Sequence, residues 1–248
     1  MFARWHWPLS AARKPIRRAD CAIIVRSTPN GGIDRVNWCA RSQRATTMPI
    51  DIRAARIEDC LALAELAQIA GDGIPGFFWR EKQSAGESLL ETGARILGEG
   101  RGNFSFRNAT VAVSGDAMAG MLLAYRLPSV EENDEDPADF PEWVRPLIEL
   151  EQCVPGSFYI NMLACFPPFR GQGIGGALMA QVDRLAVAAG CSLISIEVFG
   201  ANTGALRLYR RMGFTECERR PMVAGPLHPA GEVLLLTRPS HREQRVGP

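Results

Sequence analysis

The feature that most constrains the fold is a strand that runs straight into a glycine-rich turn and then into a helix. Residues 157–166 (SFYINMLACF) are a largely apolar run that predicts a buried strand, and PPFRGQGIGG follows over 167–176. Residues 176–190 then predict a helix with one apolar face. The first turn of such a helix has unpaired N–H groups and the positive end of the helix dipole. The turn therefore favours an anion such as a diphosphate.

The glycines fit the dinucleotide-binding pattern G-x-G-x-x-G at Gly171, Gly173 and Gly176, and Glu197 lies where an acid would bind a ribose hydroxyl. Two kinds of observation weigh against a nicotinamide dinucleotide. The stiff segment Pro167–Arg170 separates the strand from the first glycine. The turn also comes late in the chain, after a hairpin-first layout rather than a series of parallel βαβ units. We therefore discount an NAD-dependent oxidoreductase.

Coenzyme A suits the same turn better. Arg170, Gly173 and Gly175 match a different pattern, R-x-x-G-x-G, which sets a guanidinium beside the several negative charges of this carrier. Glycines at 171, 173, 175 and 176 let backbone amides approach the phosphate oxygens without a Cβ in the way. The turn therefore predicts a coenzyme A site.

Periodicity and turn signals predict one mixed α/β domain over 48–248. Strands are expected at 50–55, within 104–127 as two strands around a Ser-Gly-Asp turn, and at 157–166, 192–199, 215–220 and 232–238. Helices are expected at 58–70, 84–100, 144–153, 176–190 and 202–213. The glycine-broken, aromatic segment 71–80 and the acidic, proline-bearing segment 128–142 are expected to be loops.

Residues 1–47 differ in charge from the remainder. They hold nine basic and two acidic residues, which leaves 19 basic and 25 acidic residues for the rest of the chain. An Arg-rich, acid-poor composition fits an organelle-targeting peptide or a nucleic-acid-binding arm. We favour a disordered basic extension, because Met48 followed by PIDIRAARIEDC reads like a natural beginning.

Composition also limits where the protein works. No apolar run reaches the ~18–20 residues that span a bilayer, so we expect a soluble protein with no membrane partner. The seven cysteines show no C-x-x-C spacing, which argues against a structural zinc or a disulfide framework and favours reduced thiols in the cytoplasm. We expect no bound metal and no nucleic-acid partner for the domain.

Two linked segments resemble the GNAT acetyltransferase superfamily. The run INMLACFPPFRGQGIGGALM (160–179) is similar to its acetyl-CoA motif, and NTGALRLYRRMGF (202–214) is similar to its second motif. The resemblance extends from about Met48 to Arg238 and is sharpest over 158–214. It implies a central mixed sheet flanked by helices, in which the strand 158–166 splays away from the strand 192–199. It also implies an enzyme that uses acetyl-CoA as co-substrate.

The resemblance assigns roles residue by residue. The pantetheine arm would lie in the gap between the splayed strands and bond to main-chain groups there, while Asn202 would bind its amide. Alternatively, Asn202 is only a helix N-cap. The Cys165 thiol is expected to be a small buried side chain rather than a nucleophile, since no base is evident beside it. The residues implied in cofactor binding are Leu163, Ala164, Cys165, Arg170, Gly171, Gln172, Gly173, Ile174, Gly175, Gly176, Asn202 and Tyr209.

Catalysis would need an acid and a base. By resemblance, the Tyr209 hydroxyl protonates the departing thiolate, although an amphipathic core tyrosine is the alternative. The acceptor amine must lose a proton before it attacks, and for an amine of pKa ~10.4 this costs about 4.6 kcal/mol at pH 7. Glu197 and Glu151 are the candidate bases, and each is equally well interpreted as a solvated or salt-bridged carboxylate.

The acceptor is expected opposite the cofactor, over 71–80 and 128–150. Phe77, Phe78 and Trp79 either line an apolar wall of its site or pack the first pair of helices. The acidic residues of the insertion either attract a cationic substrate or form a solvated loop; they are Glu131, Glu132, Asp134, Glu135, Asp136 and Asp139.

The hypothesis is an N-acetyltransferase that moves an acetyl group to a primary amine of a small molecule or a peptide by direct attack in a ternary complex. The rival hypothesis is a coenzyme A-binding regulatory module without chemistry, against which the presence of Tyr209 argues. Oligomeric state is not readable from the sequence, and a homodimer stays open.

Overall fold

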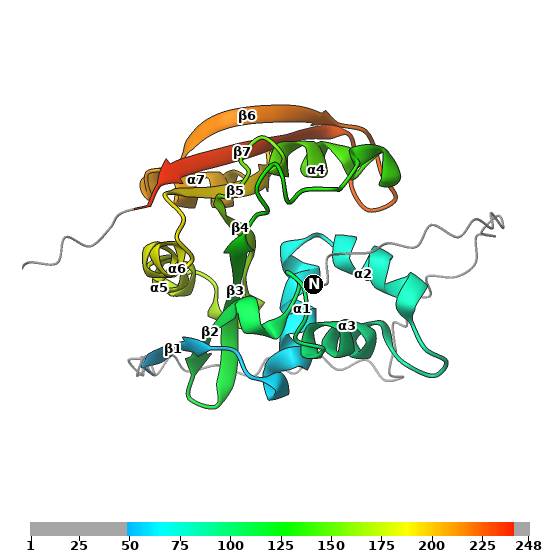
Figure 1. The fold of residues 1–248 in the computed structure, drawn as a ribbon. Coiled ribbons are helices and arrows are strands. Elements are labelled where there is room, and N and C mark those ends of the chain that lie inside the picture. The colour runs from blue at the N-terminus through cyan, green and yellow to red at the C-terminus, as the bar shows by residue number, and fades with distance from the viewer. Residues whose placement is uncertain (1–48, 241–248) are drawn as a thin grey trace, which may run out of the picture. The chain divides into compact units, whose positions relative to one another are not determined.

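Seven strands form one mixed sheet in the computed structural model, which describes residues 49–240 (Figure 1). The strand order is β1-β2-β3-β4-β5-β7-β6, and every neighbouring pair is antiparallel except β4 and β5. The mixed α/β class that the sequence predicts is therefore confirmed, and a doubly wound parallel sheet is excluded. The strands are β1 (Ile50–Ala54), β2 (Ala109–Ser114), β3 (Ala117–Arg126), β4 (Phe158–Cys165), β5 (Leu193–Phe199), β6 (Thr215–Met222) and β7 (Gly231–Pro239).

Helices cover both faces of this sheet (Figure 1). On one face, α1 and α3 pack on β2, β3 and β4, and α4 packs on β6 and β7. On the other face, α5, α6 and α7 pack on a core that includes Ile160, Ile194 and Ile196. The helices are α1 (Cys60–Ala70), α2 (Ile74–Trp79), α3 (Leu89–Gly98), α4 (Arg145–Glu151), α5 (Ile174–Met179), α6 (Val182–Ala188) and α7 (Thr203–Arg211).

Three local predictions need correction. Residues 71–80 are not a loop: Gly71 ends α1, and Gly73, at φ +85°, begins α2, where Pro75 fits the first turn. The first strand of the predicted hairpin begins only at Ala109, because a 3₁₀ turn occupies 106–108. The helix expected over 176–190 begins earlier, at Ile174, and is interrupted between α5 and α6.

The two middle strands separate part-way along their length. β4 and β5 pair in parallel only through Phe158, Tyr159 and Ile160, whose partners are residues 194–196. Beyond that point β4 stays paired with β3 and β5 stays paired with β7. A bulge in β4 lies at the point of separation, because Leu123 and Ala124 of β3 pair with Met162 and Ile160 and leave Asn161 out of register. The region between the diverging ends is called the slot below.

The basic N-terminal segment 1–47, and Met48 with it, lies outside the described residues. Among the helices over 49–240, none combines the length and the apolar character that crossing a membrane requires.

Candidate active site

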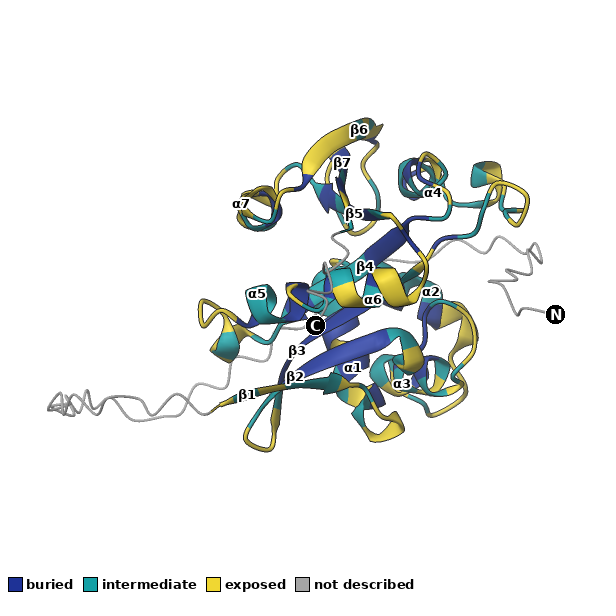
Figure 2. Ribbon diagram, turned by 60° about the vertical axis from the view of Figure 1, so that its left-hand side comes forward, coloured by how far each residue is buried: buried dark blue, intermediate teal, exposed yellow. Residues whose placement is uncertain are grey.

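The loop Arg170–Gly176, called the glycine loop below, connects the end of β4 to α5 at the mouth of the slot. Gly171 and Gly173 adopt φ values of +74° and +83°, which residues with a Cβ rarely adopt. Gly173 is also the residue that precedes the first turn of α5. Residues 170–173 are exposed, as the colouring of Figure 2 shows. The loop therefore presents backbone N–H groups to solvent at a helix start.

Two further glycines have no internal reason to be glycine. Gly175 and Gly176 lie in α5 without positive φ. A Cβ on Gly176 would meet no described atom within 4 Å, and a Cβ on Gly175 would meet Leu208 at an ordinary 3.7 Å. Alanine would suit a helix better at both positions. The space that their missing side chains leave open fits a ligand that approaches the backbone closely, as a diphosphate does.

The backbone of β4 offers hydrogen-bonding groups to the slot at alternate residues. The Phe166 N–H donates to the Ala119 carbonyl of β3, and the Ala164 carbonyl lies 2.7 Å from where a Cβ on Gly120 of β3 would be. Because backbone groups alternate in direction along a strand, those of Leu163 and Cys165 point away from β3, into the slot. Leu163 and Cys165 were expected to offer these backbone groups, and the structure directs the backbone of both to the slot, whereas it turns that of Ala164, also expected to bind the cofactor, toward β3.

Three side chains stabilise the glycine loop. The Arg170 Nε donates to the Cys165 carbonyl over 3.2 Å, and the Gln172 amide donates to the Pro168 carbonyl over 2.8 Å. Ile174 is buried in the core between α5 and the sheet. The exposed guanidinium of Arg170 thus lies at the end of β4, beside the helix start where a diphosphate would bind.

The Cys165 thiol does not have the properties of a nucleophile. Desolvation raises its pKa, and this effect outweighs the opposing influence of Arg170 and of the Gly175 N–H. A thiol with a raised pKa is largely protonated at neutral pH. The structure therefore agrees with a role for the backbone of this residue and none for its sulfur.

Asn202 and Tyr209 lie at the start and near the end of α7. The Asn202 Oδ1 accepts the Ala205 N–H over 3.1 Å, so the N-cap interpretation is confirmed, and its cofactor contact stays a prediction. Tyr209 is buried in the same core as Ile174 and Val198, with its ring 6.0 Å from that of Phe214. Burial raises the pKa of Tyr209, so its hydroxyl keeps its proton throughout the neutral range.

The opposite face of the sheet brings the two candidate bases together. Glu197 projects from β5 on the same face as Phe199, and Glu151 is the last residue of α4, which covers this face. Desolvation followed by the charge of Glu135 raises the pKa of Glu151 to about 8. Desolvation followed by the charge of Glu151 raises the pKa of Glu197 well above its ordinary value. In each case hydrogen bonding from Tyr159 opposes part of the rise.

Three residues that the sequence did not single out complete this group. Tyr125 and Tyr159 pack edge to face at 5.8 Å, and the Asn161 Nδ2 donates to the Tyr125 hydroxyl over 3.0 Å. Burial raises the pKa of both phenols, so both stay protonated. The bulge that places Asn161 here is a backbone irregularity that no residue pattern announces. These five residues are called the carboxyl cluster below: Tyr125, Glu151, Tyr159, Asn161 and Glu197.

The aromatic residues of α2 divide between two environments. Trp79 is 3% exposed and packs on Phe104 and against Gly93, so it belongs to the core beneath α1 and α3. Phe77 and Phe78 instead contact Trp143, which directly follows the acidic segment 128–142, with ring centroids 5.0 and 6.5 Å away. The expectation of an apolar wall therefore suits Phe77 and Phe78, whereas Trp79 follows the packing alternative.

The wall continues across to the end of β5. Trp143 contacts the ring of His228, in the loop between β6 and β7, at 5.4 Å, and His228 contacts Phe199 at 5.6 Å. Trp143, which follows the acidic segment 128–142, is thus joined through aromatic rings to α2 and to the end of β5. Neither Trp143 nor His228 was predicted, because a lone aromatic residue in a loop gives no signal of its partners.

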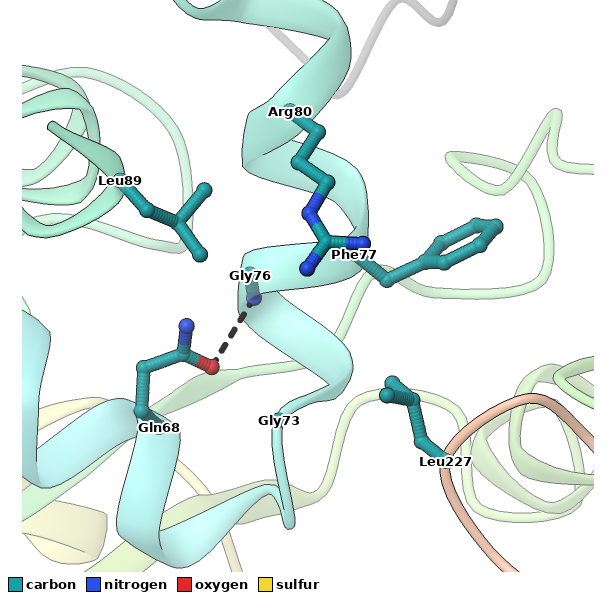
Figure 3. Close-up of a pocket in the computed structure, with 7 residues that line it drawn as sticks. All are labelled: Gln68, Gly73, Gly76, Phe77, Arg80, Leu89 and Leu227. Carbon is teal, nitrogen blue, oxygen red and sulfur yellow. Dashed lines mark hydrogen bonds between the residues drawn. The ribbon is translucent and has the colours of Figure 1, made fainter. Parts of the chain in front are cut away.

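A cavity of about 200 Å³ lies on the far side of Phe77, between α1, α2 and the β6–β7 loop (Figure 3). The Gln68 side chain accepts the Gly76 N–H over 3.0 Å at its edge. The lining residues are Gln68, Gly73, Gly76, Phe77, Arg80, Leu89 and Leu227. Phe77 therefore lines this cavity and also contacts Trp143.

Acidic side chains of the segment 128–142 bind to groups nearby in the sequence. Glu132 accepts the Ser129 N–H over 2.8 Å and pairs with Arg126 at 3.1 Å, and Asp136 accepts the Ala138 N–H over 2.8 Å. Glu135 lies nearest to the carboxyl cluster, since its charge raises the pKa of Glu151. The solvated-loop interpretation thus fits most of the run, and Glu135 is the exception.

Comparison with known proteins agrees with this geometry. Residues 104–214 match the model of the Acetyltransferase (GNAT) family. An N-alpha-acetyltransferase MAK3 from Arabidopsis thaliana is 38% identical over 61 residues, which span 25% of this chain and 32% of that relative. These two matches support the GNAT acetyltransferase superfamily for the part of the chain that they cover.

Solved structures show the same fold. A polyamine N-acetyltransferase from Drosophila melanogaster, which forms N-acetylagmatine, superposes with a TM-score of 0.54 at 16% identity and covers 77% of this chain and 100% of its own. The NatC complex bound to Gag peptide and CoA includes a chain with a TM-score of 0.50 at 20% identity, covering 77% of this chain and 99% of its own.

Proposed function

We propose that this protein is an acetyl-CoA-dependent N-acetyltransferase that acetylates a primary amine by direct attack within a ternary complex. The observation that carries the proposal is the slot. β4 separates from β5 after Ile160, its backbone groups at Leu163 and Cys165 face the gap, and an open glycine loop follows at its end. A diverging edge of this kind can pair with an extended ligand as a strand would.

The chain's own residues suit the binding of acetyl-CoA in a defined direction. The amides of the glycine loop and the Arg170 guanidinium would hold the diphosphate, and the backbone of Leu163 and Cys165 would hold the pantetheine arm. Bound acetyl-CoA supplies an activated acetyl group as a thioester. Its reactive end would then lie between α7 and the carboxyl cluster, which occupy opposite faces of the sheet.

Acid and base are then separated by the sheet. Glu197 takes one proton from the acceptor ammonium, and the resulting amine nitrogen forms the C–N bond while the C–S bond breaks. Tyr209 gives its proton to the departing sulfur and recovers the second proton that the nitrogen loses. A base whose pKa lies near the working pH is the most effective, and burial beside Glu151 moves Glu197 in that direction.

A binding and turnover experiment tests the proposal. The full chain is incubated with acetyl-CoA or with NADH, thermal stability is recorded, and release of free thiol is followed with a panel of amines. We expect stabilisation by acetyl-CoA alone and thiol release with at least one amine. Stabilisation without turnover on any amine favours the regulatory module, and stabilisation by NADH alone overturns the proposal.

A further inference from the structure

The face of the sheet that carries the carboxyl cluster, where the acetyl acceptor would bind, is called the acceptor side below. It has unpaired hydrogen-bond acceptors. Within residues 49–240, four buried side-chain polar atoms have no hydrogen-bond partner. One is the Nε of Arg238. The other two guanidinium nitrogens of Arg238 pair with Asp183 on the other face of the sheet. Two of the remaining three are the carbonyl oxygen of Asn161 and a carboxyl oxygen of Glu197. An unpaired buried acceptor is costly, so these atoms call for a ligand that donates.

Those two acceptors belong to residues at equivalent positions on neighbouring strands. Ile160 and Ile196 are the last paired residues of β4 and β5, and Asn161 and Glu197 are the next residues on the two strands. Both side chains are on the face of the carboxyl cluster: Asn161 donates to Tyr125, and Glu197 interacts with Tyr159. The two free oxygens therefore flank the base of the slot, where the sheet opens.

The third unpaired atom, the Nε2 of His228, is a further unpaired hydrogen-bond acceptor on the same face. The His228 Nδ1 lies 3.1 Å from the Pro229 carbonyl. A carbonyl can only accept, so Nδ1 carries the proton and Nε2 is an acceptor in the neutral ring. The His228 Nε2 is buried without a partner, and its ring packs on Phe199, two residues beyond Glu197 on β5. Hydrogen-bond donors are thus missing both beside Glu197 and beside His228.

The charge balance points the same way. The groups that shift the titration of Glu197 and Glu151 are other acids and phenols, namely Glu135, Glu151, Tyr159 and the Cys153 thiol, and Tyr125 faces both carboxyls. Within residues 49–240, no Lys, Arg or His is among the groups that shift the pKa values of Glu197 and Glu151. Buried carboxylates normally have such a partner. An incoming cation would supply both the missing charge and the missing donors.

We infer that Asn161 and Glu197 form a subsite that binds the acceptor as an alkylammonium group, with one N–H donated to the Asn161 Oδ1 and one to the Glu197 carboxyl. This inference rests on the proposed function for the identity of the ligand as acetyl acceptor. Asn161 is thereby a substrate-binding residue, and Glu151 is a positioning residue that acts through Glu197. The same chemistry is offered by a small diamine and by the N-terminus of a peptide.

The test measures binding separately from turnover. The full chain is saturated with CoA at pH 7.0, where an alkylamine of pKa ~10.4 and an α-amine of pKa ~7.8 are both mainly ammonium ions. It is titrated by NMR or calorimetry with n-butylamine, with 1-butanol as a neutral molecule of the same shape, with 1,4-diaminobutane and with Met-Ala amide. We expect the three amines to bind and 1-butanol to bind at least about tenfold more weakly. Which of 1,4-diaminobutane and Met-Ala amide binds more tightly identifies the source of the ammonium.

Two substitutions of one side chain should act in opposite directions. Asn161→Leu removes the acceptor and should weaken n-butylamine binding about tenfold or more. Asn161→Asp keeps the shape, adds a negative charge and should tighten it. Glu65→Gln, an exposed carboxyl on α1, is the matched control and should leave binding unchanged. Equal binding of 1-butanol and n-butylamine, or equal affinity in the Leu and Asp variants of Asn161, overturns the inference.

The two proposals can fail separately. Thiol release with native affinity for amines in Asn161→Leu would sink the subsite and leave the acetyltransferase standing. Amine binding that follows the substitutions at Asn161, without thiol release for any amine, would keep the subsite and sink the acetyltransferase. The Asp variant also guards against misfolding, because a gain in affinity requires a folded protein.

Discussion

The two sides of the slot are built in different ways. On the cofactor side, the groups available to a ligand are main-chain amides and carbonyls from one continuous segment, 163–176, of which residues 170–173 are exposed. On the acceptor side, the functional groups are buried side chains from β3, α4, β4 and β5. Under the proposed function, the first side would hold a ligand common to many enzymes, and the second side would select the molecule that receives the acetyl group.

This difference has an energetic meaning. Glycines and a helix start cost little when no ligand is bound, because water satisfies exposed N–H groups. Two neighbouring buried carboxyls are costly in their charged form, since both desolvation and mutual repulsion raise their pKa values. The neutral form of these carboxyls is therefore favoured without a ligand, and a cationic substrate would favour their charged form.

The largest effect should come from the acceptor side. Glu197→Gln keeps the shape and removes the base, so kcat/KM for the amine should fall about 10²- to 10⁴-fold. The Kd of acetyl-CoA should not change, because Glu197 lies on the face opposite the core that holds α5 and α7. Steady-state kinetics and calorimetry give the two quantities. Full activity in this variant would remove the distinction between the two sides.

Tyr209→Phe tests the acid on the cofactor side. Loss of the hydroxyl should lower kcat about 10²-fold when chemistry limits the rate, with little change in the Kd of acetyl-CoA. The ring stays in place, so its contact with Phe214 and the stability of the domain should be kept. An unaltered kcat across the pH range would assign Tyr209 to packing alone.

Gly176→Ala separates ligand binding from folding on the cofactor side. A methyl group here meets no described atom within 4 Å, so the helix should gain roughly 0.5–1 kcal/mol of stability. The Kd of acetyl-CoA should nevertheless rise, by about tenfold, because the methyl group occupies the open space that the cofactor needs. Denaturant unfolding and calorimetry measure the two effects.

Gly98→Ala provides the matched control for that experiment. Its Cβ would meet the Cys60 sulfur at an ordinary 3.6 Å, in α3 and far along the chain from the glycine loop. It should stabilise the domain similarly and leave acetyl-CoA binding unchanged. A loss of affinity in both variants would indicate a general effect of altered helices.

The smallest expected effect is a shift in pH dependence. The folded-state pKa of Glu151 is raised to about 8 by desolvation and Glu135, so its neutral form is favoured on folding. Stability from this group is present below pH ~4.5 and is lost as the pH rises through 8. Glu151→Gln should flatten the fall in Tm between pH 5 and 8. The kcat/KM profile for the amine should move to lower pH, because Glu197 no longer faces that charge.

An unchanged kcat/KM profile in Glu151→Gln would show that the two carboxyls titrate independently. The groups that also face this pair are Glu135, Tyr125, Tyr159 and the Cys153 thiol. Glu65→Gln again serves as the control, with both profiles expected to match those of the native chain.

Local patterns determined most of the fold and the cofactor side of the site. The glycines at 171 and 173 and the cap at Asn202 each depend on a few neighbouring residues, and the structure places each as predicted. The segment 71–80 was one exception, because its glycines end one helix and begin another instead of opening a loop. The direction of the backbone at Ala164 was also beyond the sequence, since it depends on the register with β3.

The sequence by itself therefore determined the class of fold, the glycine loop and the two carboxyls that can serve as base, because these follow from composition and short-range spacing. Only the tertiary structure decided that Glu151 and Glu197 meet, that a bulge turns Asn161 toward them, and that Trp143 and His228 join the wall begun by Phe77. The physical reason is separation along the chain. Contacts between residues far apart in sequence depend on strand register and helix packing, which no local pattern encodes.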